Sequence, residues 1–97
     1  MMDDETHCAI VTIHARRESQ RLSLIVRASA ATLEEITRAG AGLHEMGCEI
    51  ALLSETFPAN ADLLMLLDFI ASTQIEAEQR AREMARIERL TSGATLH

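Results

Sequence analysis

Hydrophobic and polar residues follow two different spacings along this chain. In the first third, apolar and β-branched residues alternate with polar ones in two runs, 8–15 and 21–28, joined by the polar stretch 16–20. Alternation with a period of two is typical of half-buried strands, and a short polar link between two such runs is typical of a hairpin. The pattern therefore predicts a β-hairpin over residues 8–28.

From residue 32 onward the spacing is that of a helix. Thr32 and Glu35 form the signature of a capping box, in which each side chain satisfies a backbone amide of the other residue. The pattern predicts a helix over 32–56, in which Ile36 and its equivalents build the core and small residues admit a neighbouring helix closely. Its inward stripe follows steps of three and four: Leu33, Ile36, Gly40, Leu43, Gly47 and Ile50.

Gly47 leaves an alternative open for the end of this helix. Glycine often terminates helices, and residues 48–53 would then form a third strand. We favour a continuous helix, because the apolar stripe carries through Gly47 to Ile50 and no turn residues follow directly.

A second helix is predicted over 61–90. Pro58 breaks the chain before it, and Asn60 suits the N-cap position. Over 63–70 the sequence is LLMLLDFI, so apolar side chains point to nearly every side of the helix. Residues 91–97 are expected to form a frayed tail.

The predicted fold is α+β and mostly α, with the N-terminal β-hairpin followed by a long antiparallel helical hairpin. Leaving large apolar side chains of 63–70 exposed would forfeit about 1.5–3 kcal/mol each. A homodimer with a four-helix arrangement would cover them. A monomer whose hairpin covers the apolar helix is the alternative.

The surplus of apolar surface on the second helix also predicts a protein-interaction role. The sequence does not divide these positions between self-association and the binding of another protein. The predicted contact residues are Leu63, Leu66, Leu67, Phe69, Ile70, Met84, Ile87 and Leu90.

Charge weighs against a nucleic-acid partner. The chain has a net charge of −6, and its nine basic residues are all arginines. Residues 31–60 hold five acidic residues against one arginine, and this excess of negative charge repels phosphate. The alternative function is a small DNA-binding regulator that uses the hairpin as a β-ribbon. It would depend on the arginines of the first third: Arg16, Arg17, Arg21 and Arg27.

No pattern of catalytic or cofactor chemistry is visible. His44 and Cys48 are four residues apart on a helix, but a structural zinc site needs four ligands, so we expect no metal. The sequence has no nucleophile elbow and no phosphate-binding glycine loop, so we expect no enzyme activity and no cofactor. The acidic start, residues 1–5, and the lack of a long apolar run predict a cytoplasmic protein that is neither secreted nor bound in a membrane.

The stretch from Thr32 to Glu78 resembles small pseudomonad helical-hairpin proteins. It reads TLEEITRAGAGLHEMGCEIALLSE, a break with a proline, and then ANADLLMLLDFIASTQIEAE. Size, acidity and the use of arginine alone are similar to the quorum-sensing anti-activators. This resemblance, which covers about half of the chain and leaves out its N-terminal part, implies a partner of the LuxR type. The protein would then keep that transcription factor from dimerising or from binding DNA.

Overall fold

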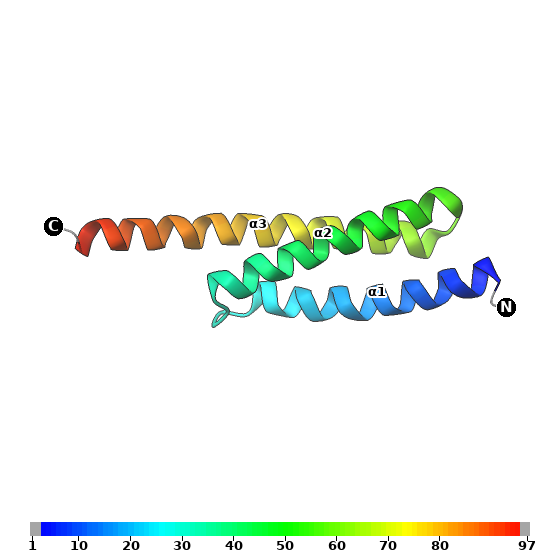
Figure 1. Ribbon diagram of the computed structural model, residues 1–97, viewed down its shortest axis with the longest axis horizontal. Coiled ribbons are helices and arrows are strands. Elements are labelled where there is room, and N and C mark those ends of the chain that lie inside the picture. The colour runs from blue at the N-terminus through cyan, green and yellow to red at the C-terminus, as the bar shows by residue number, and fades with distance from the viewer. Residues whose placement is uncertain (1–2, 96–97) are drawn as a thin grey trace.

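The computed structural model describes residues 3–95, and this part of the chain forms three α-helices and no strand. α1 spans Asp4–Arg27, α2 spans Leu33–Thr56 and α3 spans Ala61–Thr95. α1 and α3 run in the same direction, and α2 runs antiparallel to both (Figure 1). The predicted α+β fold is therefore wrong, because a single helix replaces the N-terminal β-hairpin over 8–28.

The inward face of α1 explains why its helical spacing is hard to see in the sequence. Its buried positions recur at steps of three and four, as helix packing requires, but several of them are small or polar. Ile10 and Leu24, which a pattern of hydrophobicity would place inside, are exposed. Apolar residues on the outside and hydroxyls on the inside together imitate the alternation of a strand. The buried seam consists of Cys8, Thr12, Ala15, Ser19, Leu22 and Val26.

Two buried hydroxyl groups on this seam are satisfied within α1 itself. The Thr12 hydroxyl donates a hydrogen bond to the carbonyl oxygen of Cys8 at 2.7 Å, and the Ser19 hydroxyl donates to that of Arg16 at 3.0 Å. Burying them therefore leaves no polar group without a partner. Their small size lets the α1 backbone lie close to its neighbours.

α2 begins where the sequence predicts. The capping box is confirmed: the amide of Glu35 donates to the Thr32 hydroxyl at 3.1 Å, and the amide of Thr32 donates to the Glu35 carboxylate at 3.3 Å. The helix continues through Gly47, so residues 48–53 are helical. Three residues predicted for the core are fully buried: Ile36, Leu43 and Ile50.

Two glycines of α2, Gly40 and Gly47, lie against α3. A Cβ added at Gly40 would lie 3.5 Å from the Cβ of Ala77 in α3. One added at Gly47 would lie 3.4 Å from a methyl carbon of Ile70, also in α3. A neighbouring helix does lie at these two positions, but both distances are ordinary van der Waals contacts, so a methyl group would fit at either one.

α3 is capped by Asn60, whose side-chain oxygen accepts a hydrogen bond from the amide of Leu63 at 3.2 Å. The helix runs five residues beyond its predicted end, to Thr95, and the last two residues of the predicted tail lie outside the described range. The far end of α3 extends past the α1–α2 turn (Figure 1), which gives the molecule dimensions of 65 × 19 × 18 Å. We call residues 86–95 the arm.

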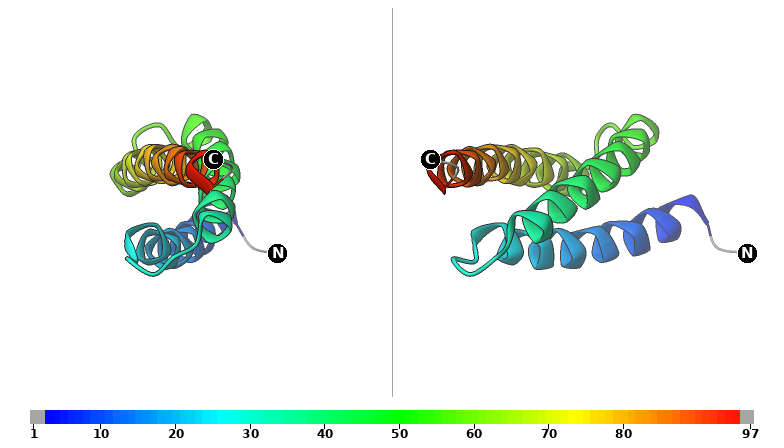
Figure 2. Two further views of the ribbon diagram at one scale, coloured as in Figure 1. Left: turned by 90° about the vertical axis from the view of Figure 1, so that its left-hand side faces the viewer. Right: turned by 60° about the vertical axis from the view of Figure 1, so that its left-hand side comes forward.

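α1 and α3 lie on the same side of α2 when the molecule is seen end-on (Figure 2), and all three pairs of helices are in contact. Polar bonds tie the end of α1 to α3. The Arg80 guanidinium donates to the carbonyl oxygen of Val26, and Arg27 forms an ion pair with Glu76 at 3.2 Å. α1 therefore packs as a helix against both α2 and α3. In the predicted four-helix dimer, helices of a second chain would pack against α2 and α3 instead.

Candidate interaction surface

The eight contact residues predicted from the sequence divide into three groups. Leu63, Leu66 and Ile70 are at most 5% exposed and form part of the core of the single chain, so they offer no surface to a partner. Leu67 and Met84 are half-buried and pack against that core. Phe69 is also half-buried, and Ile87 and Leu90 are exposed on the arm.

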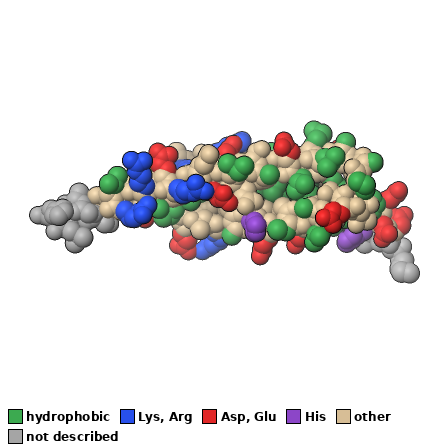
Figure 3. Space-filling model, turned by 90° about the horizontal axis from the view of Figure 1, so that it is seen from above, with side chains coloured by type: hydrophobic (Ala, Val, Ile, Leu, Met, Phe, Trp, Pro, Cys, Tyr) green, Lys and Arg blue, Asp and Glu red, His purple; other side chains and the backbone are tan. Residues whose placement is uncertain are grey.

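Other apolar side chains lie on the outside of the helices. Leu64 and Met65, which belong to the apolar stretch of α3, are 50% and 71% exposed. The structure therefore divides this stretch into a buried face and an exposed face. Seen from above, hydrophobic side chains are frequent on the part of the molecule that lies away from the arm (Figure 3). The remaining large exposed hydrophobic residues are Ile10, Ile13, Leu24, Leu52 and Ile75.

A groove of about 710 Å³ lies between α1 and α2. Every residue that lines it comes from these two helices, so it lies on the side of the pair that α3 does not cover. We call it the α1–α2 groove. Its floor is apolar and consists of Val11, Ala15, Leu22, Ile25, Ala39, Gly42 and Met46.

Small residues lie in the middle part of the groove floor: Ala15, Ala39 and Gly42. A Cβ added at Gly42 in α2 would lie only 3.3 Å from a methyl carbon of Leu22 in α1. The Leu22 side chain therefore lies close to the backbone of α2 at this point. Towards the ends, Val11, Ile25 and Met46 are half-buried and pack against the core. These three side chains still expose apolar surface that a docked helix would bury.

Charged side chains form the rim of the groove, and the rim has an excess of acid. Four glutamates stand against two arginines, together with one histidine that is exposed. A basic segment is therefore the charge type that the rim favours. The rim residues are His14, Glu18, Arg21, Glu35, Arg38, Glu45 and Glu49.

One ion pair on the rim lies within α1. Arg21 donates to both carboxylate oxygens of Glu18, with one of the two bonds at 3.0 Å. These hydrogen bonds hold the pKa of Glu18 below its usual value and raise the pKa of Arg21. Both side chains are about half exposed, so solvent screens the pair, and we assign it a role in shaping the rim and not in stability.

Two glutamates on the α2 side of the rim have no such partner. Glu45 and Glu49 are exposed, and neither takes part in an ion pair between side chains in the part of the chain that the structure describes. They are one helical turn apart and therefore lie on the same side of α2. Their negative charge is available to a partner docked in the groove.

The α1–α2 groove is not predictable from the sequence pattern, because the groove exists only if α1 is a helix. With residues 8–28 taken as a hairpin, the α1 half of the groove does not exist. The spacing of Ala15, Leu22 and Val26, which follows steps of seven and four, does indicate a helix. The larger apolar residues of the same segment alternate with polar ones, and this stronger pattern favours a strand.

The possible metal ligands are not gathered at one site. His44 and Cys48 are both exposed, with the sulfur 3.9 Å from Nε2, and the side-chain nitrogen of Gln74 lies 3.3 Å from Nδ1 of the same histidine. Cys8 is buried in α1, and its sulfur lies 3.8 Å from the amide nitrogen of Asn60. Over residues 3–95, no three His, Cys, Asp or Glu side chains cluster as metal ligands would.

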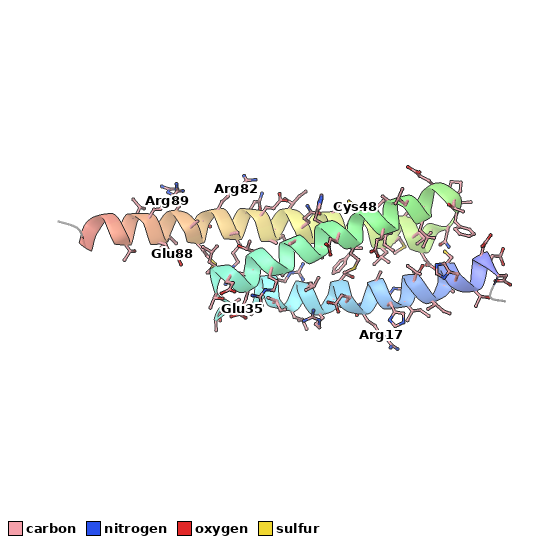
Figure 4. All side chains as sticks on the ribbon, in the orientation of Figure 1. Arg17, Glu35, Cys48, Arg82, Glu88 and Arg89 are labelled. Atoms are coloured by element: carbon pink, nitrogen blue, oxygen red, sulfur yellow. The ribbon has the colours of Figure 1, made fainter. Side chains whose placement is uncertain are left out.

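Comparisons with protein-family models, with curated proteins and with solved structures find no match to this chain. The resemblance to the quorum-sensing anti-activators therefore rests on the sequence pattern alone. Among the described residues, none of the helices combines the length and the apolar character needed to cross a membrane. The β-ribbon proposed for DNA binding does not exist, because its arginines lie on a helix, where Arg17 points away from α2 and α3 (Figure 4).

Proposed function

We propose that this protein is a non-catalytic, cytoplasmic protein-interaction protein that binds an amphipathic helix of its partner in the α1–α2 groove. The observation that carries the proposal is the groove itself, with its apolar floor and acid-rich rim. Helix-in-groove recognition needs a floor of this type, into which a partner helix places apolar side chains at steps of three and four.

The energy of such binding would come mainly from the half-buried residues of the floor. Val11, Ile25 and Met46 expose apolar surface in the unbound protein, and burying it contributes about 25 cal/mol per Å². Glu45 and Glu49 at the rim would raise the rate of encounter with a basic helix more than they would add to affinity. The expected partner segment is therefore amphipathic and basic.

The partner that we propose is a LuxR-type transcription factor, which the resemblance to quorum-sensing anti-activators such as QslA suggests. The protein would act by occupying a helix that the regulator uses to pair with itself or to reach DNA. This mechanism requires no chemistry from the chain. It requires only that the groove bind the regulator more tightly than the regulator binds its own copy or its operator.

The test is a titration of a purified LuxR-type regulator with this protein, followed by the regulator's sedimentation and by the mobility shift of its operator DNA. We expect wild-type protein to bind the regulator and to reduce the shift. Met46→Glu, which puts a charge on the groove floor, should weaken binding about 10-fold or more, because a buried charge lacks a partner there. Glu45→Arg/Glu49→Arg, which leaves the floor unchanged, should also weaken it.

Met65→Glu is the matched control, since Met65 is 71% exposed on α3 and lines no part of the groove. It introduces the same residue and should leave binding of the regulator within about twofold of wild type. Circular dichroism establishes that all variants are equally helical. Equal affinity of the wild type and both groove variants for the regulator would refute the proposed function.

A further inference from the structure

The arm presents an apolar stripe with arginines along one flank. Ile87 and Leu90 are 56% and 64% exposed. Arg86 and Arg89 of the arm follow Arg82, which lies just before it, at steps of four and three, so the three share one side of the helix. Arg82 and Arg89 both point away from α2, whereas Glu88 lies on the side of α2 (Figure 4). The arm is therefore an amphipathic helix with a basic edge.

These arginines have no ion-pair partner among the side chains that the structure describes. Seen from above, arginine side chains gather on and near the projecting end of α3 (Figure 3). The same end of the molecule thus has exposed apolar and exposed basic side chains together.

The arm has the properties that the α1–α2 groove favours in an occupant. The groove supplies an apolar floor and the exposed, unpaired carboxylates of Glu45 and Glu49, and the arm supplies Ile87, Leu90 and arginines. On α1 the groove extends from Val11 to Ile25, roughly 21 Å at the helical rise, and the ten residues of the arm span roughly 15 Å. The arm is short enough to lie entirely within the groove.

The arm cannot reach the groove of its own chain. α3 is one unbroken helix from Ala61 to Thr95, and the arm continues along the long axis beyond the turn that joins α1 and α2, the helices that form the groove (Figure 1). We propose that a second copy of this chain fills the groove, and that two copies exchange their arms to form a homodimer. A two-fold axis makes the exchange reciprocal, so that both arms and both grooves are occupied and assembly stops at two.

The proposal rests on the proposed function only in sharing the groove as a helix receptor. In the absence of a regulator, the arm of another copy would occupy the groove, and a regulator's helix would have to displace this arm. Self-association is measured on the purified protein alone. A protein that does not dimerise could still bind the regulator, and a protein that does not bind the regulator could still dimerise.

A charge exchange between arm and groove tests the pairing directly by sedimentation velocity across a concentration series. We expect the wild type to be a dimer. One variant reverses the rim, Glu45→Arg/Glu49→Arg, and the other reverses the arm, Arg86→Glu/Arg89→Glu. Each places like charges opposite each other in its own dimer, so each should dimerise about tenfold or more weakly than the wild type. All four substituted positions are exposed.

Mixing the two variants is the decisive measurement. The positive rim of one then meets the negative arm of the other, and the remaining arm and rim keep their natural charges, so both contacts are complementary. We expect the mixture to form a 1:1 heterodimer at concentrations where each variant alone is monomeric. A mixture that stays monomeric overturns the proposal, as does a rim variant that dimerises as tightly as the wild type.

A separate variant tests the apolar stripe. Ile87→Asp/Leu90→Asp should weaken dimerisation on the order of 100-fold, since two apolar anchors are lost. Ile75→Asp/Met65→Asp, which changes two similarly exposed apolar residues of α3 outside the arm, is the control and should leave the dimer intact. A wild-type protein that remains monomeric throughout the series, or that forms open polymers, overturns the reciprocal dimer.

Discussion

Asp3 acts on the fold through one side-chain oxygen at the start of α1. Its carboxylate accepts a hydrogen bond from the amide of Thr6 at 2.7 Å, and hydrogen bonding with Thr6, first with its side chain and then with its amide, lowers the pKa of Asp3 below its ordinary value of 3.8. A lowered pKa in the folded state means that the ionised form stabilises the helix. That stabilisation is present above the pKa of the unfolded chain and is lost as the pH falls through the lower, folded-state pKa.

Acidification should therefore loosen the first turn of α1. We expect exchange of the Thr6 amide hydrogen, corrected for the intrinsic pH dependence of exchange and followed by NMR, to lose protection as the pH falls from about 6 to about 2. Asp3→Asn keeps an oxygen acceptor at the N-cap but cannot titrate, so its protection should change less over the same range. Identical pH profiles for Thr6 in the two proteins would show that Asp3 is not the responsible group.

At the scale of the element, α2 contains glycines that lie against other helices, and they differ in how much space surrounds them. At Gly40 an added methyl group would be at ordinary contact distance, 3.5 Å from Ala77. At Gly42 it would be 3.3 Å from a methyl carbon of Leu22, which must shift slightly. Both positions are helical, and glycine in a helix interior is less favourable than alanine by about 0.8–1 kcal/mol.

Gly40→Ala should accordingly raise the free energy of unfolding by about 0.5–1 kcal/mol. Gly42→Ala should raise it less, because moving the Leu22 methyl group offsets part of the gain. Urea denaturation followed by circular dichroism measures both changes under the same conditions. A fall in stability for Gly40→Ala would mean that α2 and α3 are packed more tightly at Ala77 than the structure indicates.

The same element scale shows what the sequence could reveal. α2 could be predicted from the sequence for two reasons. Thr32 and Glu35 mark its start, and its inward positions include large apolar residues: Ile36, Leu43 and Ile50. α1 could not be predicted, because the residues that pack inward include Thr12 and Ser19, whose hydroxyls are satisfied by the helix backbone. Hydrophobic periodicity detects a buried face only where that face is hydrophobic.

The site was predictable only in part, for a related reason. Ile87 and Leu90 stand out as apolar residues in a polar stretch, and both are exposed. Within 63–70, by contrast, apolar residues occupy nearly every side of the helix, so only the position of α2 decides that Leu63 is buried and Met65 is exposed. The α1–α2 groove depends on two helices at once, and no spacing within one segment encodes it.

At the scale of the whole molecule, the C-terminal end of α1 is attached to α3 by polar groups. Arg80, which is half-buried, donates to the carbonyl oxygen of Val26 in the last turn of α1, and that carbonyl has no continuing helix to accept a bond from. A hydrogen bond from a charged donor typically contributes about 1.5–3 kcal/mol, more than a neutral one. The ion pair of Arg27 with Glu76 lies beside it but is about half exposed, so solvent screens it.

Arg80→Met should therefore lower the free energy of unfolding by about 1–2 kcal/mol, because methionine keeps most of the apolar stem but leaves the Val26 carbonyl without its donor. Arg17→Met, at an exposed position that points away from the other helices, should change it by less than about 0.5 kcal/mol. Urea denaturation gives both values, and hydrogen exchange locates the loss. If Arg80 holds α1 in place, protection falls most in the last turn of α1 and little at Leu63 or Ile70. An even loss of protection through all three helices would instead mean that Arg80 stabilises the core as a whole, and that α1 is not separately anchored at this end.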